Sequence, residues 1–307
     1  MDCKEAFPGL CLRYCDAVPT KKGCPPGAAL AQPPDLSNVS PSPGRGYTFV
    51  SRLVPVLILL LPGALSGQSV GHHLENGVKD MVYIWKAPTR LSGSALPALG
   101  AVAGGTAVLM LVDQPIYSWT QSHPRALPVR IITPLREGHA LNLLGRSYVL
   151  AAGSALLYTA GWAADSHDLR EAGMGCISAA FSASLSRSVF NSVIGRMRPR
   201  FERGPFVFDL FHRNWDKRSF PGGHAAHAMS CMAFWNERFD LGIAEPALYA
   251  VAAAVGWSRV VDGAHWPSDT FAGEAYGWAI GKGIADRYAR REASRRPALV
   301  LQASVPF

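Results

Sequence analysis

The chain has 307 residues, a formal net charge of +8 and 49% hydrophobic residues. The basic balance fits an anionic lipid surface, a phosphorylated substrate or a nucleic acid. We do not expect nucleic acid as a partner, because the sequence holds no nucleic-acid-binding motif.

The N-terminal part of the chain predicts export. Residues 1–49 are rich in Pro and Gly and show no periodic apolar face, so we expect a disordered or untranslated extension. Residues 50–66 have the layout of a signal peptide, with basic residues, an apolar core and small residues in order. The apolar core, 53–61, is too short for a bilayer-spanning helix of about 20 residues, which favours cleavage near Ser66. We therefore expect an exported protein, periplasmic or membrane-associated.

Residues 67–94 form an amphipathic lead-in segment. Its most amphipathic stretch, 79–88, predicts either a helix that packs over the core or one that lies on a membrane surface, and we favour packing. A helical domain follows at 95–292, and a C-terminal tail at 293–307 completes the chain.

The helical domain predicts an all-α fold. Its uncharged runs are dense in Ala and Gly and poor in strand signals, which indicates a single-domain bundle of about six core helices. The runs are Ala95–Val112, Ser147–Ala164, Ala172–Ser186, Ala225–Trp235, Pro246–Ser258 and Phe271–Ile280. Two approach membrane-spanning length, yet their small residues favour a periplasmic bundle that associates with a membrane surface. Cys176 and Cys231 lie in apolar runs, where buried free thiols are favoured over a disulfide.

Arg259, His265 and Asp269 suggest a phosphoryl-transfer site. Pro267 predicts that a helix begins there, which places Asp269 in its first turn. Asp269 could then accept a hydrogen bond from the His265 imidazole and leave its other nitrogen as an unprotonated nucleophile. Arg259 offers a planar fork for phosphate oxygens. Taken alone, the segment favours the alternative of a capping aspartate and an ordinary, partly buried histidine.

The segment Phe220–His224 contains Pro-Gly-Gly ahead of a helical run. Gly222 and Gly223 let the backbone approach a ligand, and the amides of a helix N-terminus attract anions. His224 could protonate a departing alkoxide as general acid. A plain glycine turn is the alternative.

A third segment, residues 187–200, carries four arginines in a stretch that is otherwise apolar and helix-compatible. Pro199 would end the helix, and arginines beside such a break can bind phosphate. A solvated basic helix end is the alternative. The arginines are Arg187, Arg196, Arg198 and Arg200.

The three segments resemble the type 2 phosphatidic acid phosphatase family, whose pattern is K-x6-R-P, P-S-G-H and S-R-x5-H-x3-D. Bacterial class A acid phosphatases and vanadium-dependent haloperoxidases share this pattern. The resemblance covers about residues 145–290, and the third motif matches at every specified position. It implies the helical bundle of that superfamily.

The resemblance also implies roles for individual residues. His265 would be the nucleophile that forms a phosphohistidine, Asp269 would orient it, and His224 would be the acid. The phosphoryl oxygens would be bound by Arg198 and Arg259, with a backbone donor from Gly223.

Two positions depart from the family pattern. Asn191 stands where the family has its lysine, and it can donate a hydrogen bond but no charge. Loss of such a charge typically lowers the rate roughly 10²- to 10³-fold. Arg187 lies one helical turn earlier and could reach in as a substitute across roughly 5–6 Å. Gly222 replaces the motif serine, which removes a hydroxyl and leaves the backbone amide as a phosphate donor.

The resemblance implies an exported, metal-independent phosphatase without a cofactor. Its substrate would be a phosphate monoester or diphosphate, lipid-linked as in phosphatidic acid or a polyprenyl diphosphate, or a small phosphate ester. A membrane surface is the expected partner, and the oligomeric state is open. The alternatives are a vanadate-dependent haloperoxidase and a phospholipid-binding pseudoenzyme that turns over slowly because of Asn191.

Overall fold

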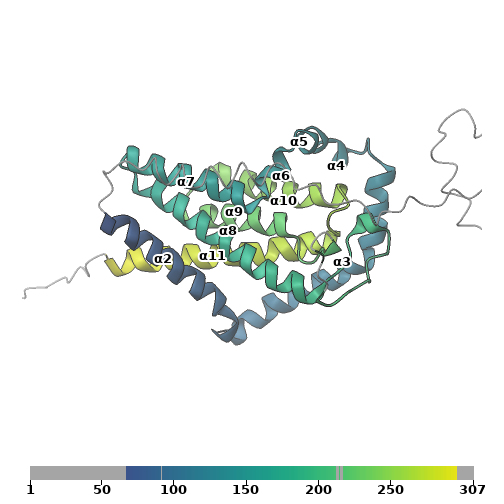
Figure 1. The fold of residues 1–307 in the computed structure, drawn as a ribbon, viewed down its shortest axis with the longest axis horizontal. Helices are drawn as coiled ribbons and strands as arrows, with labels where there is room; N and C mark the ends of the chain where they lie inside the picture. Colours follow the sequence, from purple (N-terminus) through teal and green to yellow (C-terminus); the bar gives the residue numbers. More distant parts are fainter. Residues whose placement is uncertain (1–66, 91, 212–213, 215–216, 296–307) are drawn as a thin grey trace, which may run out of the picture. The chain divides into compact units, whose positions relative to one another are not determined.

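The computed structural model describes residues 67–90, 92–211, 214 and 217–295. Within these residues the chain is helical, with two isolated β-bridges and no strand, so the prediction of an all-α fold is confirmed. Figure 1 shows the long helices packed side by side. They are α2 (Gly67–Trp85), α3 (Leu96–Ser122), α7 (Ser147–Ala163), α8 (His167–Ile194), α9 (Gly223–Arg238), α10 (Glu245–Val261) and α11 (Pro267–Arg295), and the short helices α4 (Leu127–Arg130), α5 (Thr133–Glu137) and α6 (Ala140–Leu144) connect α3 to α7.

All six predicted core helices are present as α3 and α7 to α11. Most are longer than predicted, because charged residues that ended the apolar runs lie inside the helices. Asp113 lies within α3, and its carboxylate is buried against Arg196. The predicted start of a helix at Pro267 is also confirmed, since α11 begins there.

Helix α9 lies at the centre of the bundle and contacts α7, α8, α10 and α11 (Figure 1). Residues 225–234 of α9 are all buried. Three glycines of α11, one per turn, allow its close approach: Cβ atoms at Gly273, Gly277 and Gly281 would lie 2.3–2.6 Å from carbonyl oxygens of Gly222, Ala226 and Ser230. Because of this close approach, the N-termini of α9 and α11 lie side by side. These two N-termini carry two of the three motifs.

Helix α2 packs against α8 and α11, as favoured for the amphipathic lead-in. Its buried Asp80 accepts hydrogen bonds from Arg287 and Arg291 of α11. The opposite face carries an exposed apolar stripe formed by Leu74, Val78, Val82 and Trp85.

Helix α3 turns apolar side chains outward. Gly93–Ser122 is the one segment of the described residues that is long and apolar enough to cross a membrane, and only 6% of its most apolar window is buried. Leu111, for example, is 71% exposed. An outward surface this apolar is not expected of the water-soluble bundle that we favoured from the small residues of the helical runs.

The favoured prediction of free thiols at Cys176 and Cys231 is wrong, because the two form a disulfide between α8 and α9. Small residues at this interface, including Ala179 and Ala180, are fully buried and let the helices approach closely. The two Cα atoms therefore lie 4.6 Å apart, within the range for a disulfide.

The predictions for residues 1–49 and 50–66, and for most of the C-terminal tail, lie outside the described residues. Helix α11 extends into the predicted tail as far as Arg295.

Candidate active site

The three motifs meet at one end of the bundle. The first spans the C-terminus of α8, the second leads into the first turn of α9, and the third joins α10 to α11. Backbone hydrogen bonds connect them: the Ser219 amide donates to the Arg196 carbonyl (2.7 Å), and the Gly222 amide donates to the Asp269 carbonyl (2.8 Å). The loops therefore form one rigid unit.

His265 is 2% exposed, and its Nδ1 lies 2.6 Å from the carbonyl oxygen of Ser219. Because a carbonyl only accepts, Nδ1 carries the proton and Nε2 keeps its lone pair. Burial, followed by the charges of Arg198 and Arg259, holds the pKa of His265 well below its ordinary value. The imidazole is thus neutral and suited to nucleophilic attack.

Asp269 does not orient His265 directly, which corrects the prediction. Its Oδ2 accepts a hydrogen bond from the Trp266 amide (2.8 Å), and its Oδ1 accepts one from Nη1 of Arg196 (2.6 Å). The carboxylate caps α11, because in the first turn it reaches back to an unpaired amide more easily than sideways to an imidazole. The predicted tautomer of His265 is still enforced, by Ser219 instead.

His224 lies at the N-terminus of α9, as predicted. Its Nε2 is buried and has no hydrogen-bond partner among the described residues. Burial, followed by the charge of Arg259, lowers the pKa of His224 to about 2. His224 is therefore neutral in this site, and donation of a proton to a leaving group would require substrate binding to raise its pKa.

Arg198 and Arg259 both lie beside His265, since each lowers its pKa. Nε of Arg198 donates to the Arg218 carbonyl (3.0 Å), and Nη1 of Arg259 donates to Asp262 (2.8 Å). Nε of Arg259 is buried without a partner among the described residues. Each guanidinium group is anchored through one of its nitrogens, and a planar guanidinium group suits the binding of an anion.

Arg187 reaches the site, as we suggested for a substitute of the missing lysine. A Cβ on Gly223 would lie 2.3 Å from Nε of Arg187, so the guanidinium passes directly across this glycine. Arg187 also lowers the pKa of His265 and of His224. Asn191 is fully buried, and its Nδ2 donates to the Phe220 carbonyl (3.1 Å), so it supports the second motif loop.

The expectation that the Gly222 amide serves as a phosphate donor is wrong, because that amide donates to Asp269. A Cβ at Gly222 would lie 2.9 Å from the same carbonyl oxygen. Close packing of the second and third motifs therefore excludes a larger residue here. The amides of Gly223 and His224, in the first turn of α9, are the backbone donors that can face an anion.

A buried ionic network below the site was not predicted. Arg196 is fully buried and donates to Asp113 and Asp269 at 2.6 Å each, and Asp113 also accepts from the Ser268 amide (2.9 Å). Asp113 is the single charged residue of α3. A lone carboxylate in an apolar helix generally has a buried partner. Asp113 is therefore the sequence signal from which the network could have been predicted.

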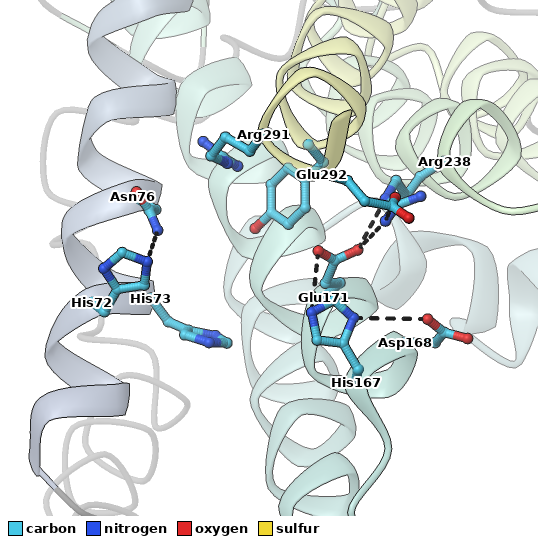
Figure 2. A pocket seen from close by; sticks show the side chains of 10 residues that line it. His72, His73, Asn76, His167, Asp168, Glu171, Arg238, Arg291 and Glu292 are labelled. Atoms are coloured by element: carbon cyan, nitrogen blue, oxygen red, sulfur yellow. Dashed lines mark hydrogen bonds and ion pairs between the residues drawn. The ribbon is translucent and has the colours of Figure 1, made fainter. Parts of the chain in front are cut away.

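A separate polar pocket of about 350 Å³ lies between α2, α8, α9 and α11 and contains none of the predicted site residues. Figure 2 shows Glu171 between His167 and Arg238. Arg238 pairs with Glu171 (2.7 Å) and Glu292 (2.9 Å). This pocket is therefore a cluster of mutually paired side chains, and we assign it a structural role.

Residues 172–292 match the model of the PAP2 superfamily. Curated relatives include the lipid A 1-phosphatase of Rhizobium etli, 34% identical over 110 residues, which cover 35% of this chain and 47% of that protein. The lipid A 1-phosphatase of Rhizobium johnstonii is 34% identical over 97 residues, 31% of this chain and 39% of that protein. That of Porphyromonas gingivalis is 37% identical over 68 residues, 21% of this chain and 15% of that protein.

The chain thus spans about half or less of the length of these curated relatives. Among solved structures, a transmembrane PAP2-type phosphatidylglycerolphosphate phosphatase from Bacillus subtilis aligns with 72% of this chain and 99% of its own. The alignment has a TM-score of 0.35 and 18% identity.

Proposed function

We propose that this protein is a metal-independent phosphatase that hydrolyses a lipid-linked phosphate through a phosphohistidine on His265. The match of residues 172–292 to the model of the PAP2 superfamily supports this proposal. One observation carries the proposal. The hydrogen bond from Nδ1 of His265 to the Ser219 carbonyl (2.6 Å) directs an unprotonated Nε2 into a site bordered by arginines.

In the first half-reaction, Nε2 of His265 attacks the phosphorus, and the bond from phosphorus to the leaving oxygen breaks. Arg198, Arg259 and Arg187 stabilise the charge on the equatorial oxygens, together with the first amides of α9. Preorganised donors of this kind typically supply roughly 10²- to 10³-fold each. Once the bound phosphate has raised its pKa, His224 can protonate the leaving oxygen as general acid.

In the second half-reaction, water attacks the phosphohistidine, inorganic phosphate leaves, and His265 returns to its neutral state. Having given its proton to the leaving oxygen, His224 can accept the water proton while the phosphoryl charge holds its pKa raised. No step needs a metal ion, since guanidinium groups neutralise the phosphoryl charge.

Two features support a lipid substrate at a membrane. The outward face of α3 and the exposed apolar stripe of α2 offer apolar surface to a bilayer. The relatives named above are lipid A 1-phosphatases, which act on phosphorylated lipids.

Export to the periplasm is part of the proposal. The Cys176–Cys231 disulfide supports it, because disulfides persist in oxidising compartments.

The test is phosphate release by the purified full chain from an aryl phosphate, phosphatidic acid and a polyprenyl diphosphate, with and without EDTA. We expect release from at least one substrate, unchanged by EDTA, and a trapped acid-labile phosphoenzyme. His265→Ala should abolish both, whereas the control His123→Ala, at an exposed histidine of another loop, should retain both.

Persistent turnover in His265→Ala would contradict the proposal, as would no release from any of the three substrates. Two further assays identify the alternatives. Vanadate-dependent bromide oxidation would indicate a haloperoxidase, and lipid binding without turnover would indicate a pseudoenzyme.

A further inference from the structure

The loop between α6 and α7 lies directly against His224. A Cβ on Gly145 would lie 2.6 Å from Cβ of His224 and 2.7 Å from its Cδ2, so there is no space between the loop backbone and the imidazole. The φ of Gly145 is −89°, which any residue adopts, so glycine is needed here for the close approach alone. This contact orients the His224 ring, because its buried Nε2 has no hydrogen-bond partner among the described residues.

His227 holds the loop in this place. It is buried one turn after His224 on α9, and its Nδ1 lies 3.0 Å from the carbonyl oxygen of Gly145. Because a carbonyl only accepts, Nδ1 of His227 carries a proton and donates it to this bond. On the other side of the ring, Nε2 lies 2.9 Å from the Ser184 hydroxyl of α8. His227 therefore connects α8 to the loop between α6 and α7.

Both nitrogens of the His227 ring have a partner. Burial lowers the pKa of His227 to about 4, so the ring is neutral and Nε2 accepts from the Ser184 hydroxyl. A buried polar group whose partners are all present makes its surroundings rigid, whereas a lost partner leaves a polar group unpaired. The position of Gly145 is therefore fixed from the core of the bundle.

On the basis of the proposed function, we infer that His227 is a positioning residue, which holds the imidazole of His224 beside the leaving oxygen through its hydrogen bond to Gly145. His227 acts through this contact and not on the substrate. Proton transfer requires heavy atoms within about 2.6–3.2 Å of each other. A displacement of about 1 Å at a reacting group can lower the rate roughly 10²-fold. Gly145 precedes the residues that match the family model, 172–292, so the contact adds to what the three motifs supply.

The nucleophile is held by a different set of bonds. Nδ1 of His265 donates to the Ser219 carbonyl (2.6 Å), and the second motif loop is joined to the third by the bond from the Gly222 amide to the Asp269 carbonyl. Neither bond involves the loop between α6 and α7. Loss of the bond from His227 to Gly145 should therefore impair proton transfer by His224 and leave the nucleophile in place.

Two substitutions of His227 separate its two hydrogen bonds. The amide nitrogen of asparagine lies as many bonds from Cβ as Nδ1 of histidine does, so His227→Asn can still donate to Gly145. The amide nitrogen of glutamine corresponds in the same way to Nε2, so His227→Gln keeps a polar group for Ser184 and loses the donor to Gly145.

The rates are measured with the full chain on whichever substrate of the panel above the wild type hydrolyses fastest. We expect His227→Gln to lower kcat roughly 10- to 100-fold, as for a displaced reacting group. His227→Asn should lower kcat less than about fivefold, since it loses only a bond that does not reach the site. Each variant keeps one of the two bonds, so thermal unfolding should give similar midpoints for both.

The background His224→Ala shows whether the effect passes through His224. This variant alone should lower kcat roughly 10²- to 10⁴-fold, the usual contribution of a general acid. Adding His227→Gln should then lower the residual rate less than about twofold, because there is no longer an imidazole to position. A purely structural role of His227 would lower the residual rate as much as it lowers that of the wild type.

Gly145→Ala tests the same contact from the loop. Its new Cβ would displace His224, so kcat should fall in the wild type and change little in the His224→Ala background. The matched control is Gly153→Ala in α7, where a new Cβ meets nothing within 4 Å, and it should keep the wild-type rate. This pair decides the question if a His227 variant does not fold.

Equal rates in His227→Asn and His227→Gln, or effects of His227→Gln and Gly145→Ala that are undiminished in the His224→Ala background, would overturn the positioning role and leave the phosphatase proposal standing. Wild-type protein that releases phosphate from no substrate of the panel would overturn the proposed function and this inference with it.

Discussion

Arg196 and Asp269 form a fully buried ion pair, with 2.6 Å between Nη1 and Oδ1. The same guanidinium donates to Asp113 of α3, also at 2.6 Å. The first turn of α11, which follows His265, is thereby joined to α3, a helix distant in sequence. The loop that carries His265 depends on this network for its position, because Asp269 also caps α11.

Arg196→Ala should destabilise the fold by roughly 3–5 kcal/mol, because it leaves two buried carboxylates without their cation. Thermal or denaturant unfolding measures this change. The control is Asp165→Asn, which removes the charge from an ion pair with Arg170 in which Asp165 is 99% exposed. Asparagine tolerates the positive φ of 47° at this position, so the control should change stability by less than about 1 kcal/mol. Similar losses in the two variants would show that the buried network is no more important than a surface pair.

Arg187→Ala should lower kcat roughly 10²- to 10³-fold, because Arg187 supplies the charge that the family places at position 191. Asn191→Lys should not rescue this variant. Asn191 is fully buried and its amide supports the Phe220 carbonyl, so a lysine there loses that bond and adds a buried charge. A double variant as active as the wild type would contradict the assignment.

Gly223→Ala should lower the phosphatase rate by displacing Arg187, whose Nε lies 2.3 Å from the position of the new Cβ. The matched control is Gly153→Ala within α7, where a new Cβ meets nothing within 4 Å. That control should retain activity and gain about 0.5–1 kcal/mol of stability, since alanine favours helix over glycine. Steady-state kinetics and thermal unfolding of both variants measure these effects. An unchanged rate in Gly223→Ala would contradict the role of Arg187 in the site.

The acid limb of the pH–rate profile should lie well below pH 6.5. Protonation of Nε2 removes the nucleophile as the pH falls, and the pKa of His265 is held well below its ordinary value by burial and by Arg198. Arg198→Ala removes one of the charges, so the acid limb should move upward toward 6.5. The substrate phosphate titrates at about pH 6 in the assays of both proteins, so it does not contribute to the shift of the acid limb between the wild type and Arg198→Ala. If the acid limb lies at the same pH in both proteins, protonation of His265 does not determine it.

Removal of the Cys176–Cys231 disulfide should cost about 2–4 kcal/mol of stability, because it closes a loop across the core. The double variant Cys176→Ala, Cys231→Ala and the reduced wild type should show similar losses. Thiol labelling under denaturing conditions, before and after reduction, measures the bond directly. Full labelling of unreduced protein prepared from an oxidising compartment would contradict it.

The helices were predictable because each is encoded locally. Runs of Ala and Gly interrupted by charge and proline predicted all six core helices, and Pro267 marked the start of α11. The predicted ends were too early where a charged residue such as Asp113 has a buried partner far away in sequence. Neither the hydrophobic periodicity of a segment nor its helix propensity indicates such a partner.

The gathering of His224, His265, Arg198 and Arg259 was expected from the resemblance of the three motifs to the phosphatase family, and Arg187 was suggested as a substitute for the motif lysine. Their individual contacts did not. Asp269 contacts Arg196 and its own helix, the Ser219 carbonyl orients His265, and the Gly222 amide is engaged by packing. Each of these depends on how loops meet across the end of the bundle.

The sequence by itself determined the helical elements and the residue types of the site, since both depend on near neighbours along the chain. Only the tertiary structure decided which groups pair: Asp113 with Arg196, Cys176 with Cys231, and Gly145 with His224. These contacts join segments separated by tens of residues, and close packing of glycine- and alanine-rich helices sets their distances.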